Sequence, residues 1–232
     1  MSDQRQRLLV ILGLIVLGLA CLPIDLAMSR WFLQGGLPGE IRSIFHRGEV
    51  FGHGYGVLAV VITIYLVNPQ RRRQVGVAAA SFAVAGLTAN VLKIQFWRVR
   101  PYAGVSIPEV RDTFVGSFWT GSSRDLVEFS NNALRSFPSG HTAGAVAFAY
   151  ALGRMYPQGR GWFMLLAALC AGNRVDGGAH FLSDVFWGAA VGMLASTWVT
   201  DRMWSRVELR PDSSQPPTLQ DVETCTNDRR AA

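Results

Sequence analysis

The sequence has few charged residues for its length. Of 232 residues only 16% are charged and half are hydrophobic, whereas a soluble domain would carry about a quarter charged residues. Charge is missing altogether from six segments, residues 8–24, 51–70, 74–92, 136–153, 161–173 and 185–200. A helix needs about 20 residues to cross a bilayer, and helices are the spans that satisfy their own backbone hydrogen bonds in lipid. The sequence therefore predicts an all-α, polytopic membrane bundle with six transmembrane helices.

Lysine and cysteine are also scarce. Lys93 is the single lysine among 22 basic residues, so a chain that otherwise uses arginine keeps one lysine at the end of the third apolar segment. The three cysteines are Cys21, Cys170 and Cys225, which indicate small buried side chains rather than a disulfide framework. A signal sequence ending at a lipoprotein-like Cys21 is an alternative for the first segment.

The net charge of +6 does not indicate nucleic-acid binding, because the arginines are dispersed between apolar segments. Many of them fall at alternate ends of the predicted spans, at Arg5, Arg7, Arg71–Arg73, Arg154, Arg160, Arg202 and Arg206. This is the positive-inside pattern, and it places both termini in the cytoplasm. Arginines at the opposite ends, namely Arg98, Arg100 and Arg174, are not explained by topology and need another cause.

The segments between the spans complete the predicted organisation. Residues 29–49 mix apolar and charged side chains, which predicts an interfacial amphipathic segment between the first two spans. The longest connection, residues 101–136, lies on the outer side, and connections of that length are usually functional or mobile. We expect one domain over 1–206, and a polar, disordered cytoplasmic tail over 207–232.

Three polar clusters fall at outer ends of the predicted spans. Lys93 and Arg100 are seven residues apart, so they share a face if the helix continues, and Pro101 indicates a helix end at Arg100. Ser139, Gly140 and His141 begin the fourth span, where an N-cap serine and free backbone N–H groups favour an anion. Taken alone, the first cluster could be snorkelling cations and the second a capped helix with an interfacial histidine.

The third cluster contains Arg174, His180 and Asp184. The spacing of His180 and Asp184 is i, i+4, so a carboxylate can hold one ring nitrogen and leave the other as a nucleophile. Gly177 and Gly178 predict a loop between Arg174 and His180. An interfacial salt bridge is the structural alternative for this cluster.

Together the clusters supply three cations, a helix N-terminus, a nucleophile with an orienting carboxylate, and a second histidine. Phosphoryl transfer without a metal needs such a set, because fixed cations stabilise the charge on the equatorial oxygens. No H-E-x-x-H or paired-aspartate motif is present. His46 and His53 belong to a different segment and receive no role. We therefore expect no metal and no cofactor.

The order Lys-x6-Arg-Pro, Pro-Ser-Gly-His and Arg-x5-His-x3-Asp closely resembles the type 2 phosphatidic acid phosphatase superfamily, over about residues 50–200. The resemblance implies that His180 attacks phosphorus, Asp184 orients it, and His141 protonates the leaving group. It also implies that Lys93, Arg100, Arg174, Ser139 and the Gly140 backbone bind the phosphate. Asn173 departs from the pattern, since the family usually has serine there.

The resemblance implies an integral membrane lipid phosphatase. The positive-inside pattern places its site on the outer, periplasmic face of the inner membrane, and the charges at the hydrophobic boundary indicate that the substrate enters from the bilayer. Undecaprenyl diphosphate, phosphatidylglycerophosphate, phosphatidate and lipid A 1-phosphate all fit the motifs. Transfer of the phosphoryl group to another lipid is an open alternative. A membrane transporter is a second class, although its charges should lie near mid-span. The oligomeric state is left open.

Overall fold

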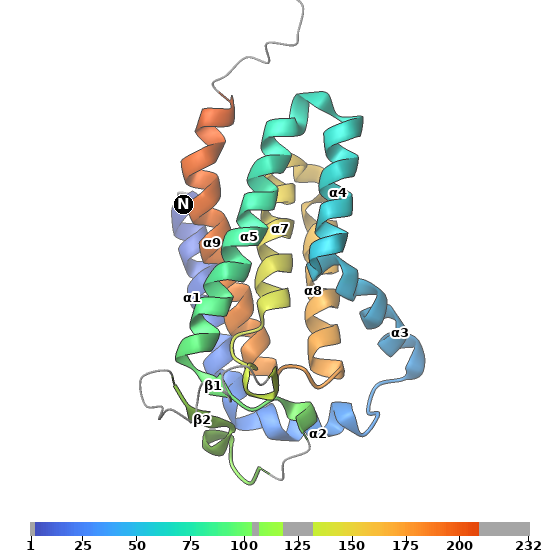
Figure 1. The fold of residues 1–232 in the computed structure, drawn as a ribbon, viewed down its shortest axis with the longest axis vertical. Coiled ribbons are helices and arrows are strands. Elements are labelled where there is room, and N and C mark those ends of the chain that lie inside the picture. Colours follow the sequence, from blue (N-terminus) through green and yellow to red (C-terminus); the bar gives the residue numbers. More distant parts are fainter. Residues whose placement is uncertain (1–2, 104–106, 118–131, 209–232) are drawn as a thin grey trace, which may run out of the picture.

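The computed structural model describes residues 3–103, 107–117 and 132–208 as a bundle of long helices with their ends gathered at two poles (Figure 1). Each of the six predicted apolar segments contains one helix. These are α1 (Asp3–Cys21), α4 (Gly54–Val67), α5 (Arg72–Gln95), α7 (Gly140–Met155), α8 (Arg160–Asp176) and α9 (Leu182–Glu208). Residues 209–232 of the predicted tail lie outside the described residues, and α9 takes up its first two positions.

Three helical segments within the described residues are long and apolar enough to cross a membrane: Gln4–Leu33, Pro69–Gln95 and Leu182–Ser205. A fourth would be the pair Gly39–Gly52 and Gly54–Val67, which is bent by 65°. The outer faces carry large exposed apolar side chains, such as Leu12 on α1, Leu58 on α4 and Leu194 on α9. Large apolar side chains on the outer surface are typical of a helical membrane protein. That the protein has six complete spans stays a prediction.

Two shorter helices occupy the predicted interfacial region. Helices α2 (Asp25–Leu33) and α3 (Gly39–Gly48) precede the 3-10 helix Glu49–Gly52. Helix α2 lies at the pole where α5 ends and α9 begins, and α3 lies at the side of the bundle against α8 (Figure 1). Their depth in a membrane stays a prediction. Asp25 in α2 is fully buried, so this segment is tied to the bundle and does not lie only on its surface.

The all-α prediction missed a small antiparallel sheet at the same pole. Strand β1 (Trp97–Arg98) pairs with β2 (Phe114–Gly116), with Trp97 opposite Gly116 and Arg98 opposite Phe114. The strands are too short to show a period-2 pattern in the sequence. They end α5 at Gln95 and turn the chain back toward the bundle.

Helix α7 lies at the centre and packs against α5, α8 and α9 (Figure 1). Its buried positions are mostly alanine and glycine, and small side chains let helix backbones approach closely. The backbones of α7 and α9 are in close contact, because a Cβ at Gly188 would lie only 2.5 Å from the Ser139 carbonyl oxygen. Gly192, one turn further along α9, meets the Ala143 carbonyl in the same way.

Replacing Gly188 by alanine should therefore force α7 and α9 apart and cost about 1–3 kcal/mol of stability. Thermal unfolding of the purified protein in detergent measures the loss. Gly76→Ala on α5 is the matched control, since nothing lies within 4 Å of its added Cβ. Equal unfolding midpoints for the two variants would contradict the close-packing account.

Candidate active site

The three predicted clusters meet at one pole of the bundle. Lys93 lies at the end of α5, Ser139 and Gly140 at the start of α7, and Arg174 in the last turn of α8. The chain then turns through Gly177 and Gly178 into α9, so His180 and Asp184 reach the same pole (Figure 1).

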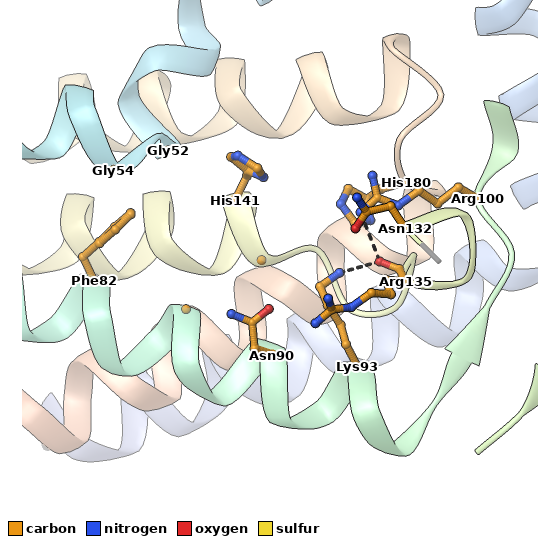
Figure 2. Close-up of a pocket in the computed structure, with 12 residues that line it drawn as sticks. Gly52, Gly54, Phe82, Asn90, Lys93, Arg100, Asn132, Arg135, His141 and His180 are labelled. Carbon is orange, nitrogen blue, oxygen red and sulfur yellow. Dashed lines mark hydrogen bonds between the residues drawn. The ribbon is translucent and has the colours of Figure 1, made fainter. Parts of the chain in front are cut away.

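A cavity of about 320 Å³ opens among these elements. Figure 2 shows Lys93, Arg100 and His180 around it, with His141 facing the same space from α7. Gly140 also lines the cavity, whereas Ser139, Arg174 and Asp184 are not among its lining residues. The predicted residues thus divide into five that border the cavity and three that do not.

A backbone carbonyl fixes the orientation of His180. Its Nδ1 lies 2.6 Å from the Ser136 carbonyl oxygen, and a carbonyl can only accept, so Nδ1 carries the proton. Nε2 is left with a lone pair, and the ring is 2% exposed. Burial, reinforced by the charges of Lys93 and Arg100, lowers the pKa of His180 to about 4. At neutral pH the imidazole is therefore uncharged and able to act as a nucleophile.

Asp184 does not hold His180 through the direct hydrogen bond that the i, i+4 spacing predicts. Its Oδ2 lies 3.9 Å from His180 Nδ1, which is too long for a hydrogen bond. The same oxygen accepts from the Ser136 hydroxyl at 2.6 Å and from the Phe181 N–H at 2.9 Å. The carboxylate therefore acts on His180 through Ser136, whose hydroxyl it holds and whose carbonyl holds the ring.

Arg98 is the main residue of the site region that sequence reasoning did not place. It is fully buried, and its guanidinium bridges Asp184 at 2.6 Å and Asp25 at 2.8 Å. It also donates to the hydroxyls of Ser183 at 2.8 Å and Thr113 at 3.0 Å. The sequence signal that could have indicated its role is its position at a span end where the positive-inside pattern does not explain an arginine.

Lys93 and Arg100 share a backbone acceptor at the cavity wall. Both donate to the Arg135 carbonyl oxygen, Lys93 at 2.6 Å and Arg100 at 3.4 Å (Figure 2). The two side chains meet although the helix does not continue between them, because β1 turns Arg100 back. Arg100 Nε is buried and has no hydrogen-bond partner among the described residues, which leaves a cationic donor for an anion.

The cations crowd one another. Burial lowers the pKa of Arg100, and the neighbouring charges of Arg174 and Arg135 lower it as well. Arg135 lines the cavity too and was not predicted. Concentrated positive charge of this kind is stabilised when a dianion binds among the cations.

The start of α7 has the predicted cap. The Ser139 side chain accepts from the Thr142 N–H, at 3.4 Å, and lies 2.9 Å from the Thr142 hydroxyl. Ser139 is fully buried, so its hydroxyl supports the helix start and does not face the cavity. The cavity is bordered by the next residues, Gly140 and His141.

Asn173, which stands where the family usually has serine, connects Arg174 to a histidine. Its Oδ1 accepts from Arg174 Nε at 3.2 Å, and its Nδ2 lies 3.2 Å from His46 Nδ1. Arg174 also pairs with Glu49 at 2.5 Å. Glu49 thus satisfies a cation that the resemblance assigns to phosphate.

Asp176 belongs to α8 and not to the loop predicted between Arg174 and His180. It ends α8 and is buried, and its carboxylate pairs with Arg42 of α3 at 3.2 Å. It therefore ties α3 to α8 behind the site. His53, which was set aside, has its ring centroid 4.9 Å from that of His141.

Residues 74–208 match the PAP2 superfamily. The chain belongs to the PAP2 superfamily. The resemblance seen in the motifs is confirmed, and together with the apolar helices it identifies an integral membrane protein.

Two curated relatives are lipid A 1-phosphatases. Those of Rhizobium johnstonii and Rhizobium etli are 35% and 36% identical to the chain over 108 and 109 residues. The aligned part is 47% of this chain but only 39% and 41% of the relatives' own lengths. The chain therefore spans less than half of each of these proteins.

Two crystal structures share the fold. Aquifex aeolicus LpxE has a TM-score of 0.54 at 19% identity, covering 77% of this chain and 95% of that one. A transmembrane PAP2-type phosphatidylglycerolphosphate phosphatase from Bacillus subtilis has a TM-score of 0.57 at 20% identity, covering 88% and 98%.

Replacing Arg98 by methionine should leave Asp25 and Asp184 buried without their shared counter-ion. Removing one partner of a buried ion pair costs about 3–5 kcal/mol, so we expect a clearly lower unfolding temperature in detergent. Arg111→Met is the control, because the Arg111 side chain is 79% exposed and its loss should change stability by less than about 0.5 kcal/mol. Equal effects of the two changes would refute the anchoring role of Arg98.

Proposed function

We propose that this protein is a membrane lipid phosphatase that removes a phosphate from a lipid phosphate or diphosphate without a metal. The observation that carries the proposal is the orientation of His180, a cavity-lining residue whose Nδ1 lies 2.6 Å from the Ser136 carbonyl oxygen. A nucleophile held in one tautomer among cations suits attack on a phosphorus atom. The PAP2 family and the lipid A 1-phosphatase relatives support the same class of reaction.

In the proposed reaction, Nε2 of His180 forms a bond to phosphorus as the bond to the leaving oxygen breaks. His141 gives a proton to that oxygen, which becomes an alcohol or a phosphate. Water then attacks phosphorus as the bond between phosphorus and Nε2 breaks, His141 takes up a proton from the water, and inorganic phosphate leaves. Asp184 keeps the ring oriented through Ser136 in both steps.

The phosphate would lie against Lys93, Arg100 and the Gly140 backbone, which all border the cavity. Arg174 can join them when it leaves Glu49, and Ser139 contributes by capping the helix that presents Gly140. The charge that develops on the equatorial oxygens is then stabilised by fixed cations.

The topology belongs to the same proposal. Six spans with both termini in the cytoplasm would put the site at the outer face of the inner membrane, where a lipid phosphate enters laterally from the bilayer. The candidate substrates are undecaprenyl diphosphate, phosphatidylglycerophosphate, phosphatidate and lipid A 1-phosphate. The names of the relatives favour testing the last of these first.

The decisive experiment measures the products formed from this panel of lipids by purified protein in EDTA. We expect phosphate release by the wild type and a loss of at least about a thousandfold in His180→Ala, since the nucleophile is gone. Activity abolished by EDTA would sink the metal-free mechanism, and an active alanine variant would sink the nucleophile. Labelled phosphate that appears on a second lipid, and not in solution, would show a phosphotransferase instead.

The anion-binding role of Gly140 has its own test. A Cβ there would meet Lys93 Cε at 3.8 Å and Ala89 Cβ at 3.9 Å, which are ordinary contacts, so Gly140→Ala should fold normally. The methyl group would nevertheless enter the space of the phosphate, and we expect kcat/KM to fall at least about tenfold. Gly86→Ala, in the same cavity wall with nothing within 4 Å of its Cβ, should keep full activity. Full activity in both variants would remove Gly140 from the phosphate site.

A further inference from the structure

Three metal-binding side chains meet beside the proposed phosphate site. Glu49 comes from the 3-10 helix before α4, His53 caps α4, and His141 lies in the first turn of α7. One ligand atom from each lies within 4.8 Å of the others, and His53 Nε2 is 3.9 Å from Glu49 Oε1. His141 thus joins Glu49 and His53, which are four residues apart, in a compact group.

The chemistry of the group matches zinc better than a hard cation. Two imidazoles and one carboxylate are a ligand set that zinc takes in sites with an open fourth position. Calcium needs six to eight oxygens, and magnesium prefers oxygens in an octahedron. The bond lengths of zinc, about 2.0–2.2 Å, place tetrahedral ligand atoms about 3.3 Å apart, so the side chains need to close in by an ångström or so.

The side chains have room to make this movement. The His53 side chain is 41% exposed and that of Glu49 27% exposed, so neither is locked by packing. Both contacts of Glu49 described by the structure, to His53 and to Arg174, use Oε1. Its second carboxylate oxygen can therefore bind an ion while the contact with Arg174 persists.

We propose that Glu49, His53 and His141 bind one divalent transition-metal ion of the zinc type, and that the bound ion switches the enzyme off. A ring nitrogen that coordinates a metal carries no proton, so His141 could not protonate the leaving group from that atom. The inhibition rests on the proposed function, whereas the binding does not. The ion would be a regulator beside a metal-free reaction and takes no part in the chemistry.

The first test measures binding without any reference to activity. Full-length protein purified without a polyhistidine tag is titrated with zinc by calorimetry in detergent, for the wild type, His53→Ala and His46→Ala. We expect one zinc per chain in the wild type and His46→Ala, and affinity at least tenfold weaker in His53→Ala. His46 is the matched control, because it contacts Asn173 and lies outside the group. No zinc binding by the wild type, or equal affinity in all three proteins, overturns the proposal.

The second test measures the dephosphorylated lipid product, since zinc also binds free phosphate. Zinc should abolish the wild-type activity and EDTA should restore it. His53→Ala should keep its activity in EDTA, because His53 is not part of the proposed machinery, and should tolerate at least ten times more zinc. Inhibition with the same midpoint in both proteins overturns the regulatory role. No product from any lipid in EDTA would instead refute the proposed function, and the calorimetry would still decide the metal site.

Discussion

The buried guanidinium of Arg98 is the interaction on which the site depends. It lies between the carboxylates of Asp25 and Asp184 with no exposure to solvent, and each of these groups would be costly to bury alone. The three charges connect α2, the short sheet and the first turn of α9. One interaction therefore joins the segment after α5 to α2 and to the start of α9.

The network of Arg98 reaches His180 indirectly, through Asp184 and Ser136. Arg98 holds Asp184, Asp184 holds the Ser136 hydroxyl, and the Ser136 carbonyl holds the ring of His180. The Ser136 carbonyl oxygen is uncharged, so it keeps the proton on Nδ1 of His180 without adding a negative charge beside the ring. The Asp184 carboxylate lies one residue further from the ring, where it pairs with Arg98 and accepts from Ser136.

Much of this arrangement could be read from the sequence, because it follows from local patterns. The charge-free segments gave the positions of the six long helices, and the motif at Ser139 gave the helix cap. The meeting of the three clusters followed from alternating helix directions. The partners of Arg98 could not be read, because Asp25 lies 73 residues away and a single sequence contains no sign of that contact. The same applies to His53, which reaches His141 only through the bend between α3 and α4.

Asp25 lies outside the part of the chain that matches the family, although it contacts Arg98 within that part. The region that matches the PAP2 superfamily begins at residue 74, so one of the two counter-ions of Arg98 comes from a segment that the match does not include. A fragment starting at that boundary would keep every motif residue but lose one of the two carboxylates that Arg98 contacts. The segment before residue 74 thus contributes a buried carboxylate to the network that holds Arg98 and the start of α9.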